Sequence, residues 1–410
     1  MIRLASIELE NFKNVGRGRI SLSSAGPDPE EWDADIVGIY GQNGSGKTSA
    51  ITALYVLKAI WGLGKLPDFC EDCMMVGQRS FTVSVEAVAH FESGEFPDCR
   101  FTYLVEAGRT DDKFSVLSER LTYKMLSEGR SSARTAFEYR MSDVGAPFRP
   151  YVAWDALCAM GKDLSIEAAV ARRLASSDGR PLLMTDAFRR LLEQMRAAYS
   201  LKSESGKASK KSKDAYANVL RPTIALRNEL REFATRHLSI VTTSRQAEPM
   251  LNVLRISTHE GTEGESADAY FMVDLSNSSF VLDENIRDLQ ATISTISTVI
   301  GALVPGLKVE VKSLGKAMND DGGAGEHIEI VATRGGTTVP LRAESEGIKK
   351  LVAILILLVD VYSKPESCVA VDELDSGVFE FLLGEILQVL QDHGRGQLIF
   401  TAHNLRPLET

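Results

Sequence analysis

The sequence has few cysteines and no long hydrophobic run. Its 410 residues include five cysteines, an odd number that argues against a disulfide framework and favours reduced thiols in a cytoplasm. The longest apolar run, residues 351–359, is too short to cross a bilayer. Arg3, Glu8 and Glu10 stand where a signal peptide needs apolar residues. We therefore expect a cytoplasmic protein with no membrane partner.

Several sequence patterns are also missing. No sustained heptad is present, which excludes a long coiled coil, and we find no internal repeat, Ser-His-Asp arrangement or nuclease-like carboxylate cluster. The net charge of −10 argues against indiscriminate coating of nucleic acid, although a local basic face remains open. With 44% hydrophobic and 25% charged residues, the composition is that of a globular protein, and the length favours two or three domains.

Hydrophobic periodicity divides the chain into three parts. Residues 1–150 alternate as strands do, and 81–91, 101–105 and 121–125 predict an antiparallel meander with one wet face. Residues 151–240 have a helical period, interrupted at 202–213 by a lysine-rich, small-polar stretch that predicts a flexible linker. Residues 241–410 return to mixed structure. The predicted helices there are 283–303, 348–359 and 376–391, and the predicted strands are 308–314, 327–332, 367–371 and 397–401.

A glycine-rich loop provides the strongest local pattern. It lies between an apolar run at 36–40, which predicts a buried strand, and a helical period that begins near residue 51. Residues 41–48 match G-x-x-x-x-G-K-[ST] without a mismatch. Glycines let several backbone N–H groups converge on one phosphate at the positive end of the helix. Lys47 would then neutralise β- and γ-phosphate oxygens, and Thr48 would bind Mg²⁺. The alternative is an ordinary glycine turn.

Two acids and a histidine near the end of the chain support a nucleotide site. Asp372 and Glu373 follow a short apolar strand, a pattern that alone would indicate a solvated strand end. Together with the glycine loop, it predicts that Asp372 holds Mg²⁺ and that Glu373 takes the proton from an attacking water. His403 follows the next predicted strand, where a γ-phosphate contact is expected. This hypothesis requires both ends of the chain to form one pocket.

In this order, the motifs resemble those of ABC-type ATPases, particularly the heads of the SMC, RecF and OLD-like group. The opening Leu9–Lys13 is similar to their first strand motif, residues 41–48 to Walker A, 344–350 to the signature, 368–373 to Walker B, and His403 to the switch histidine. The resemblance implies an α/β P-loop NTPase head. Such a head has a mixed central sheet, an antiparallel β layer and, here, a helical insertion.

The resemblance also implies which residues surround ATP and Mg²⁺. These are Lys13, Gly41, Asn43, Gly44, Ser45, Gly46, Lys47, Thr48, Ser49, Ser345, Gly347 and Asp375, with Thr48 and Asp372 as metal ligands and Lys47, Glu373 and His403 in catalysis. Gln78 and Gln194 both fit the Q-loop glutamine poorly.

The signature-like segment departs from the usual Leu-Ser-Gly-Gly. Glu344 replaces Leu and Glu346 replaces the first Gly, whereas Ser345 and Gly347 remain. The alternative interpretation is a plain helix N-cap by Ser345. If the segment is a signature, the resemblance implies that two copies pack head-to-tail around ATP. Ser345 and Gly347 of one copy would then bind the γ-phosphate held by Lys47 of the other.

Family features that this sequence lacks narrow down which kind of ABC-type ATPase it resembles. SMC proteins need a long coiled coil, which this sequence lacks. OLD nucleases carry a C-terminal domain, for which the seven residues after His403 leave no room. We therefore expect either a truncated chain or a partner that completes the head. The local sequences around Ser345, Asp372 and His403 resemble those of ATPases of bacterial anti-phage defence. Such ATPases work with a separately encoded effector, often a nuclease. The alternatives are a RecF-like DNA-repair ATPase and a scaffold that binds ATP without turnover.

Two weaker patterns remain open. Cys70 and Cys73 have the spacing of half a zinc site, but only His90 and Cys99 lie nearby as further ligands. The lysines of 202–213 could contact phosphates of DNA or another nucleic acid, although a solvated linker is favoured.

Overall fold

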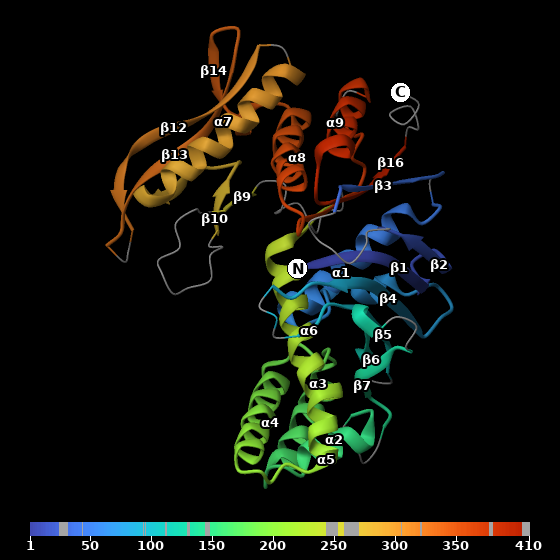
Figure 1. Cartoon of the computed structure of the whole chain (residues 1–410). Coiled ribbons are helices and arrows are strands. Elements are labelled where there is room, and N and C mark those ends of the chain that lie inside the picture. Colours follow the sequence, from blue (N-terminus) through green and yellow to red (C-terminus); the bar gives the residue numbers. More distant parts are fainter. Residues whose placement is uncertain are drawn as a thin grey trace. The chain divides into compact units, whose positions relative to one another are not determined.

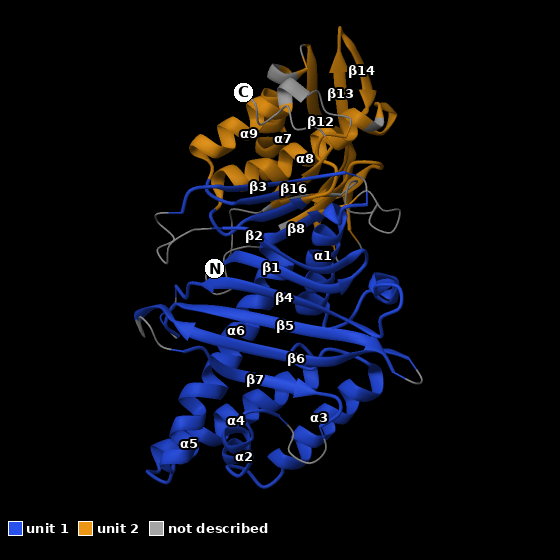
Figure 2. Ribbon diagram, turned by 90° about the vertical axis from the view of Figure 1, so that its right-hand side faces the viewer, with its two compact units in different colours: residues 1–240, 365–370, 395–399 blue, residues 241–364, 371–394, 400–410 orange. Residues whose placement is uncertain are grey.

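The computed structural model describes most of the chain in two compact units. The described residues are 1–23, 32–42, 44–92, 94, 96–110, 113–128, 132–143, 148–242, 253–257, 270–304, 306–319, 322–376 and 380–403. Unit 1 consists of residues 1–240, 365–370 and 395–399, and unit 2 of residues 241–364, 371–394 and 400–410 (Figure 2). Each unit has its own hydrophobic core.

The largest sheet of unit 1 is antiparallel, with the strand order β2-β1-β4-β5-β6-β7 (Figure 1). Its strands are β1 (Ile2–Phe12), β2 (Val15–Ser21), β4 (Ser80–Ala89), β5 (Cys99–Arg109), β6 (Phe114–Met125) and β7 (Arg134–Arg140). Val85, Tyr103 and Leu121 lie opposite one another in the register and are fully buried. The predicted meander is confirmed, because a period of two buries one face of each strand.

Helices of unit 1 share one core with this sheet. They are α1 (Lys47–Leu63), α2 (Tyr151–Cys158), α3 (Leu164–Asp178), α4 (Asp186–Glu204), α5 (Lys210–Ala215) and α6 (Arg221–Glu232), with short helical turns at Asp68–Cys73, Leu126–Glu128, Tyr216–Leu220 and Phe233–His237. Aromatic rings join the helical region to β7: Phe137 lies with its ring centroid 5.0 Å from that of Phe188 and 6.1 Å from that of Trp154. These apolar contacts attach the helices to the sheet.

The lysine-rich segment 202–213 is helical at both ends, which corrects the prediction of a flexible linker. Helix α4 continues to Glu204, and α5 begins at Lys210. Ser209 caps α5 by accepting a hydrogen bond from the N–H of Ser212 at 3.1 Å. Tyr199 and Tyr216 stack with centroids 3.8 Å apart, which packs the end of α4 against the segment after α5. A cap and an aromatic contact therefore stabilise helix where the composition indicated none.

A second sheet has the strand order β3-β16-β15-β8. Its strands are β3 (Asp35–Tyr40), β8 (Leu238–Val241), β15 (Cys368–Val371) and β16 (Gln397–Ala402). The N–H of Gln397 donates to the carbonyl of Ser367, and further along, the N–H of Leu374 donates to that of Thr401. Both bonds follow the same chain direction, so β15 and β16 are parallel. Strands β15 and β16 are short, apolar and buried. Strand β3, which the sequence predicted to be buried, is half-buried along its length because it lies at the edge of this sheet.

Unit 2 combines long helices with antiparallel strands. The helices are α7 (Ile286–Leu303), α8 (Glu346–Ser363) and α9 (Glu380–His393), with short turns at Asp283–Asn285 and Leu341–Ala343. The strands β11 (Ser279–Leu282), β13 (Ala324–Arg334) and β12 (Leu307–Met318) form one sheet, to which β14 (Thr337–Pro340) adds beside β13. The strands β9 (Val253–Ser257) and β10 (Tyr270–Asp274) form a separate pair. Apolar residues of α7 and α8 share the core with these strands.

The architecture is therefore α/β with an antiparallel layer and a helical region, and the predicted fold class is confirmed at that level. Within the described ranges, every helix is too short or too polar to cross a bilayer.

Candidate functional site

The glycine-rich loop of unit 1 connects β3 directly to α1. Gly44 and Gly46 have φ angles of 82° and 96°, in the left-handed region, and Gly46 is the N-cap of α1. A Cβ atom at Gly46 would lie 2.7 Å from Cγ2 of Val15, so a side chain is excluded there on steric as well as conformational grounds. The loop thus ends at a helix N-terminus, where backbone N–H groups attract anions.

Lys47 follows the loop as the first residue of α1. Its side chain is 8% exposed, and its Nζ atom donates to the carbonyl oxygens of Gly41 at 2.6 Å and Gln42 at 3.2 Å. The ammonium is therefore held by two neutral acceptors of the loop itself. Phosphate oxygens form stronger, charge-assisted hydrogen bonds, so an incoming phosphate would replace these carbonyls as the partner. The neighbouring Thr48 is exposed at the first turn of α1.

The turn between β1 and β2 lies against the loop and the first turns of α1. The side-chain amide of Asn14 donates to the carbonyl of Gly44, and its Oδ1 accepts from Ser49 Oγ at 3.0 Å. Lys13 has a left-handed φ of 51°, and its Nζ donates to Thr52 Oγ1 at 2.8 Å. Lys13 thus reaches the second turn of α1, while Asn14, which the sequence analysis missed, holds the loop. The predicted site residue Asn43 lies outside the described residues.

In unit 2, Asp372 lies at the end of β15 and is 1% exposed. The hydroxyl of Thr401 donates to Oδ1 of Asp372 at 2.6 Å. The N–H of Asp372 donates to the carbonyl of Val241 at 2.8 Å. These bonds fix the carboxylate, a hard oxygen ligand of the kind that Mg²⁺ prefers. In the described part of the chain, no group of three or more His, Cys, Asp and Glu side chains is placed so that it could hold a metal ion.

Glu373 has a left-handed backbone, with a φ of 52°. This conformation costs an L-amino acid about 1 kcal/mol, so the surrounding contacts must hold it. Its N–H donates to Thr401 Oγ1 at 2.8 Å, and its carbonyl accepts from Lys350 Nζ at 2.8 Å. Its carboxylate Oε1 lies 3.5 Å from Nε2 of His403.

Asp375 joins the same cluster. Its Oδ2 accepts from the N–H of His403 at 2.9 Å. The structure thus brings together the predicted residues Asp372, Glu373, Asp375 and His403 at the ends of β15 and β16. It also places Lys350 and Thr401 there, which the sequence analysis did not identify. Thr401 is a buried hydroxyl at the end of an apolar strand, two residues before His403, and that position could have indicated it.

The signature-like segment begins α8. Ser345 is the N-cap of this helix, and its hydroxyl accepts from the N–H of Ile348 at 3.4 Å. Ser345 is exposed and Gly347 is half-buried. The cap interpretation therefore fits the geometry, and the exposed hydroxyl leaves the signature interpretation open. Farther along α8, burial lowers the pKa of Lys350, while the carboxylates of Glu373, Asp375 and Asp372 favour its charged form.

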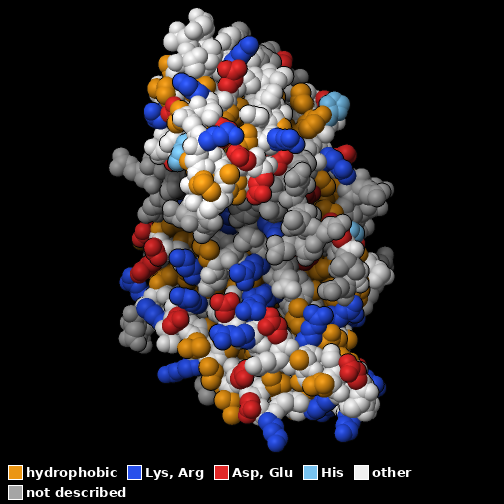
Figure 3. Space-filling view, turned by 90° about the vertical axis from the view of Figure 1, so that its left-hand side faces the viewer, with side chains coloured by type: hydrophobic (Ala, Val, Ile, Leu, Met, Phe, Trp, Pro, Cys, Tyr) orange, Lys and Arg blue, Asp and Glu red, His pale blue; other side chains and the backbone are white. Residues whose placement is uncertain are grey.

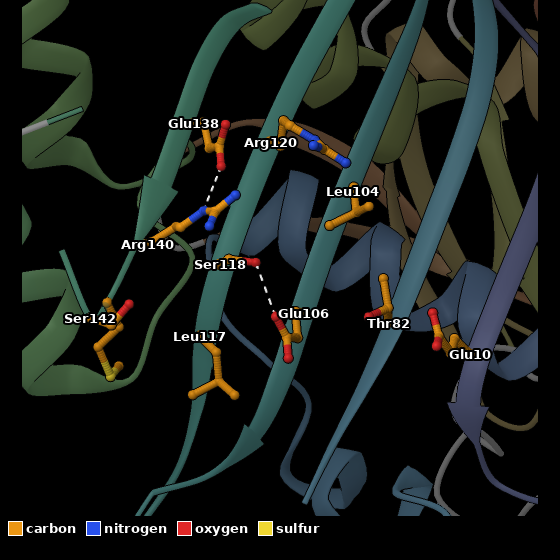
Figure 4. A pocket seen from close by; sticks show the side chains of 11 residues that line it. Glu10, Thr82, Leu104, Glu106, Leu117, Ser118, Arg120, Glu138, Arg140 and Ser142 are labelled. Atoms are coloured by element: carbon orange, nitrogen blue, oxygen red, sulfur yellow. Dashed lines mark hydrogen bonds and ion pairs between the residues drawn. The ribbon is translucent and has the colours of Figure 1, made fainter. Parts of the chain in front are cut away.

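A separate groove of about 650 Å³ lies on the six-stranded sheet of unit 1 (Figure 4). None of the predicted site residues lines it. Within the groove Glu106 accepts a hydrogen bond from Ser118, and Arg140 pairs with Glu138. The lining holds the acids Glu10, Glu106 and Glu138 against the bases Arg120 and Arg140, so it does not have the positive character of a phosphate site.

The structure also describes the cysteine pair Cys70 and Cys73 and the face that carries the lysines of 202–213. Burial raises the pKa of Cys73 to about 11 and raises that of Cys70 well above its ordinary value. Among the described residues, no third His, Cys, Asp or Glu side chain joins Cys70 and Cys73 in a group that could hold a metal ion. Over the face that carries α4, Lys and Arg side chains alternate with Asp and Glu and do not form one continuous basic patch of described residues (Figure 3).

Comparison with known proteins finds no matching family and no matching curated protein. Among solved structures, the chain is similar to the Smc head domain of Pyrococcus furiosus with an extended coiled coil bound to the C-terminal domain of ScpA (15% identity, TM-score 0.43, 100% of this chain and 92% of that chain). It is also similar to the SMC head domain of Thermotoga maritima (15%, 0.37, 99% and 91%). A third is the recombination mediator protein RecF of the RecFOR pathway (13%, 0.32, 98% and 93%).

Proposed function

We propose that this chain is an ABC-type ATPase that binds ATP and hydrolyses it with Mg²⁺. The observation that carries the proposal is the cluster of Asp372, Glu373 and His403 in a chain that also holds a buried Lys47 in a left-handed glycine loop. A solvated strand end would not require a buried, hydrogen-bonded Asp followed by a left-handed Glu beside a His. The cluster instead has the groups that hydrolysis of a phosphoanhydride needs.

Each group has a chemical role in this proposal. Lys47 and the loop N–H groups neutralise and orient the β- and γ-phosphates, and Thr48 and Asp372 hold Mg²⁺. The metal, when bound, shields negative charge on the phosphate oxygens. Glu373 accepts the proton of the attacking water, and His403 contacts the γ-phosphate. The glycine loop follows β3 and the two acids follow β15, and in this proposal both segments act on one nucleotide.

We further propose that two copies associate around ATP. Ser345 is exposed at the N-terminus of α8, and a helix N-terminus favours negative charge. Ser345 and the N–H of Gly347 would bind the γ-phosphate held by Lys47 of the second copy. Hydrolysis then weakens the dimer, because ADP lacks the shared phosphate group.

The proposed role in anti-phage defence rests on the resemblance of the motif sequences to those of anti-phage ATPases. We propose that the ATP-bound dimer controls an effector encoded by another gene, with a nuclease as the expected class. Phage protection of cells that carry both genes should then require Lys47 and Glu373. Protection that persists in a Lys47→Ala strain would contradict this role.

Steady phosphate release by purified protein tests the proposed activity. We expect Mg²⁺-dependent turnover and an ATP-dependent doubling of mass in light scattering. Strong stimulation by DNA would favour a RecF-like repair enzyme over an effector controller. Tight ATP binding without phosphate release would instead establish a scaffold and contradict the proposed hydrolysis.

A further inference from the structure

The backbone of Glu373 is held at both of its polar groups by side chains from other elements of unit 2. Thr401, on β16, accepts from its N–H at 2.8 Å. Lys350, on α8, donates to its carbonyl oxygen at 2.8 Å. Asn11, Lys13 and Glu373 are the non-glycine residues of the described chain with positive φ, and Asn tolerates this conformation better than Glu does. Strain of this kind persists only where neighbouring groups determine it.

Lys350 connects two functional segments of the chain. It lies in the second turn of α8, the helix whose N-cap is Ser345. Its ammonium is half-buried even though burial disfavours its charge, and it donates a hydrogen bond to the carbonyl oxygen of Glu373. A displacement of the first turns of α8 would therefore pull directly on the peptide group of Glu373.

We propose that Lys350 is a positioning residue that couples the start of α8 to the general base of the same chain. This inference rests on the proposed function. In a head-to-tail dimer, Ser345 and Gly347 of one chain bind the nucleotide of one site, whereas Glu373 of that chain acts at the other site. Lys350 thus links the occupancy of one nucleotide site to the geometry of the base in the second site. Hydrolysis should be cooperative in ATP for this reason.

Replacement of the ammonium tests the coupling. Lys350→Met keeps the length of the side chain but has no donor, and Lys350→Arg keeps a charged donor. Lys364→Met is the matched control, because it removes an ammonium from the other end of α8, where Lys364 pairs with Asp360. For each protein we would measure ATP affinity, kcat, the Hill coefficient for ATP and the thermal unfolding temperature.

We expect Lys350→Met to lower kcat at least 10-fold, to change ATP affinity less than 3-fold, and to reduce the Hill coefficient to 1. Lys350→Arg should retain most turnover and cooperativity, and Lys364→Met should behave as the wild type does. If Lys350→Met does not fold, Lys350→Gln is used with the same expectations. A merely structural lysine would change the unfolding temperature without abolishing cooperativity.

A double variant distinguishes action through Glu373 from an independent effect. Once Glu373→Gln has removed the base, adding Lys350→Met should slow the residual reaction no further, because coupled residues are not additive. A multiplicative loss in the double variant, or wild-type kcat and cooperativity in Lys350→Met, would overturn this inference alone. A wild-type protein that binds ATP without turnover would overturn the proposed hydrolysis, and the coupling with it.

Discussion

The Nε2 atom of His403 lies 3.5 Å from the Oε1 atom of Glu373, at the ends of two neighbouring parallel strands. The two side chains are 44% and 37% exposed, so this contact contributes little to stability. The contact matters because it places the Glu373 carboxylate beside the His403 imidazole. A general base must lie within hydrogen-bond reach of the water whose proton it takes, and a partly exposed carboxylate beside an imidazole can do so.

Glu373→Gln should separate binding from chemistry. The amide retains the size of the side chain but cannot accept the proton, so we expect kcat to fall by about 10²-fold or more. ATP binding should persist, and the nucleotide-bound dimer should accumulate in size-exclusion chromatography. Unaltered phosphate release would show that another group is the base.

Lys47→Ala should remove ATP binding. The variant loses the charge-assisted hydrogen bonds to the phosphates, and we expect affinity to fall by at least about 100-fold. Lys65→Ala is the control, since Lys65 is an exposed lysine just beyond the C-terminus of α1. Titration with a fluorescent ATP analogue measures both. Normal affinity in Lys47→Ala would mean that residues 41–48 are not the phosphate loop.

Thr401→Val and Thr401→Ser test the buried hydroxyl that joins Asp372 to Glu373. Valine has the same shape but loses both hydrogen bonds, which should lower the free energy of unfolding by about 1–3 kcal/mol and kcat by about 10-fold or more. Serine retains the hydroxyl and should keep most of the activity. Chemical denaturation and phosphate release provide the two readouts. Equal kcat values for the two variants would exclude a role of the hydroxyl in positioning the base.

Glu119 in β6 predicts a pH dependence of stability. It is fully buried and accepts hydrogen bonds from the Tyr103 hydroxyl at 2.6 Å and from the N–H groups of Leu182 and Leu183, in the connection between α3 and α4. Burial raises its pKa to about 7, although these bonds favour the charged form. A carboxyl group whose pKa is raised by folding stabilises the fold below its unfolded pKa, and this contribution is lost as the pH rises through the folded value.

The free energy of unfolding should therefore fall by on the order of 2 kcal/mol between pH 5 and pH 7.5 through this group. Urea denaturation of Glu119→Gln should lack that part of the decrease. Glu10→Gln, at an exposed position on the same sheet, should keep it. If both variants follow the wild type, Glu119 does not titrate in this range.

Local patterns predicted the elements of the fold well. Alternation of apolar residues identified β4, β5 and β6, and the loop between an apolar run and a helical period was found between β3 and α1. The lysine-rich stretch was misjudged because the contact between Tyr199 and Tyr216 joins residues 17 positions apart, beyond the reach of a local composition argument. The joint action of the glycine loop and the acids on one nucleotide remains a prediction.

The sequence by itself determined the chemistry that is available: a glycine loop with Lys47, and two acids followed after a further strand by His403. Only the tertiary structure decided which groups hold that chemistry in place. Asn14 binds the loop, and Thr401 and Lys350 bind the backbone of Glu373, across separations of 28 and 23 residues. The physical reason is that motif residues are recognised by their spacing along the chain. Hydrogen bonds between elements depend instead on how strands and helices pack, and no short sequence window contains that information.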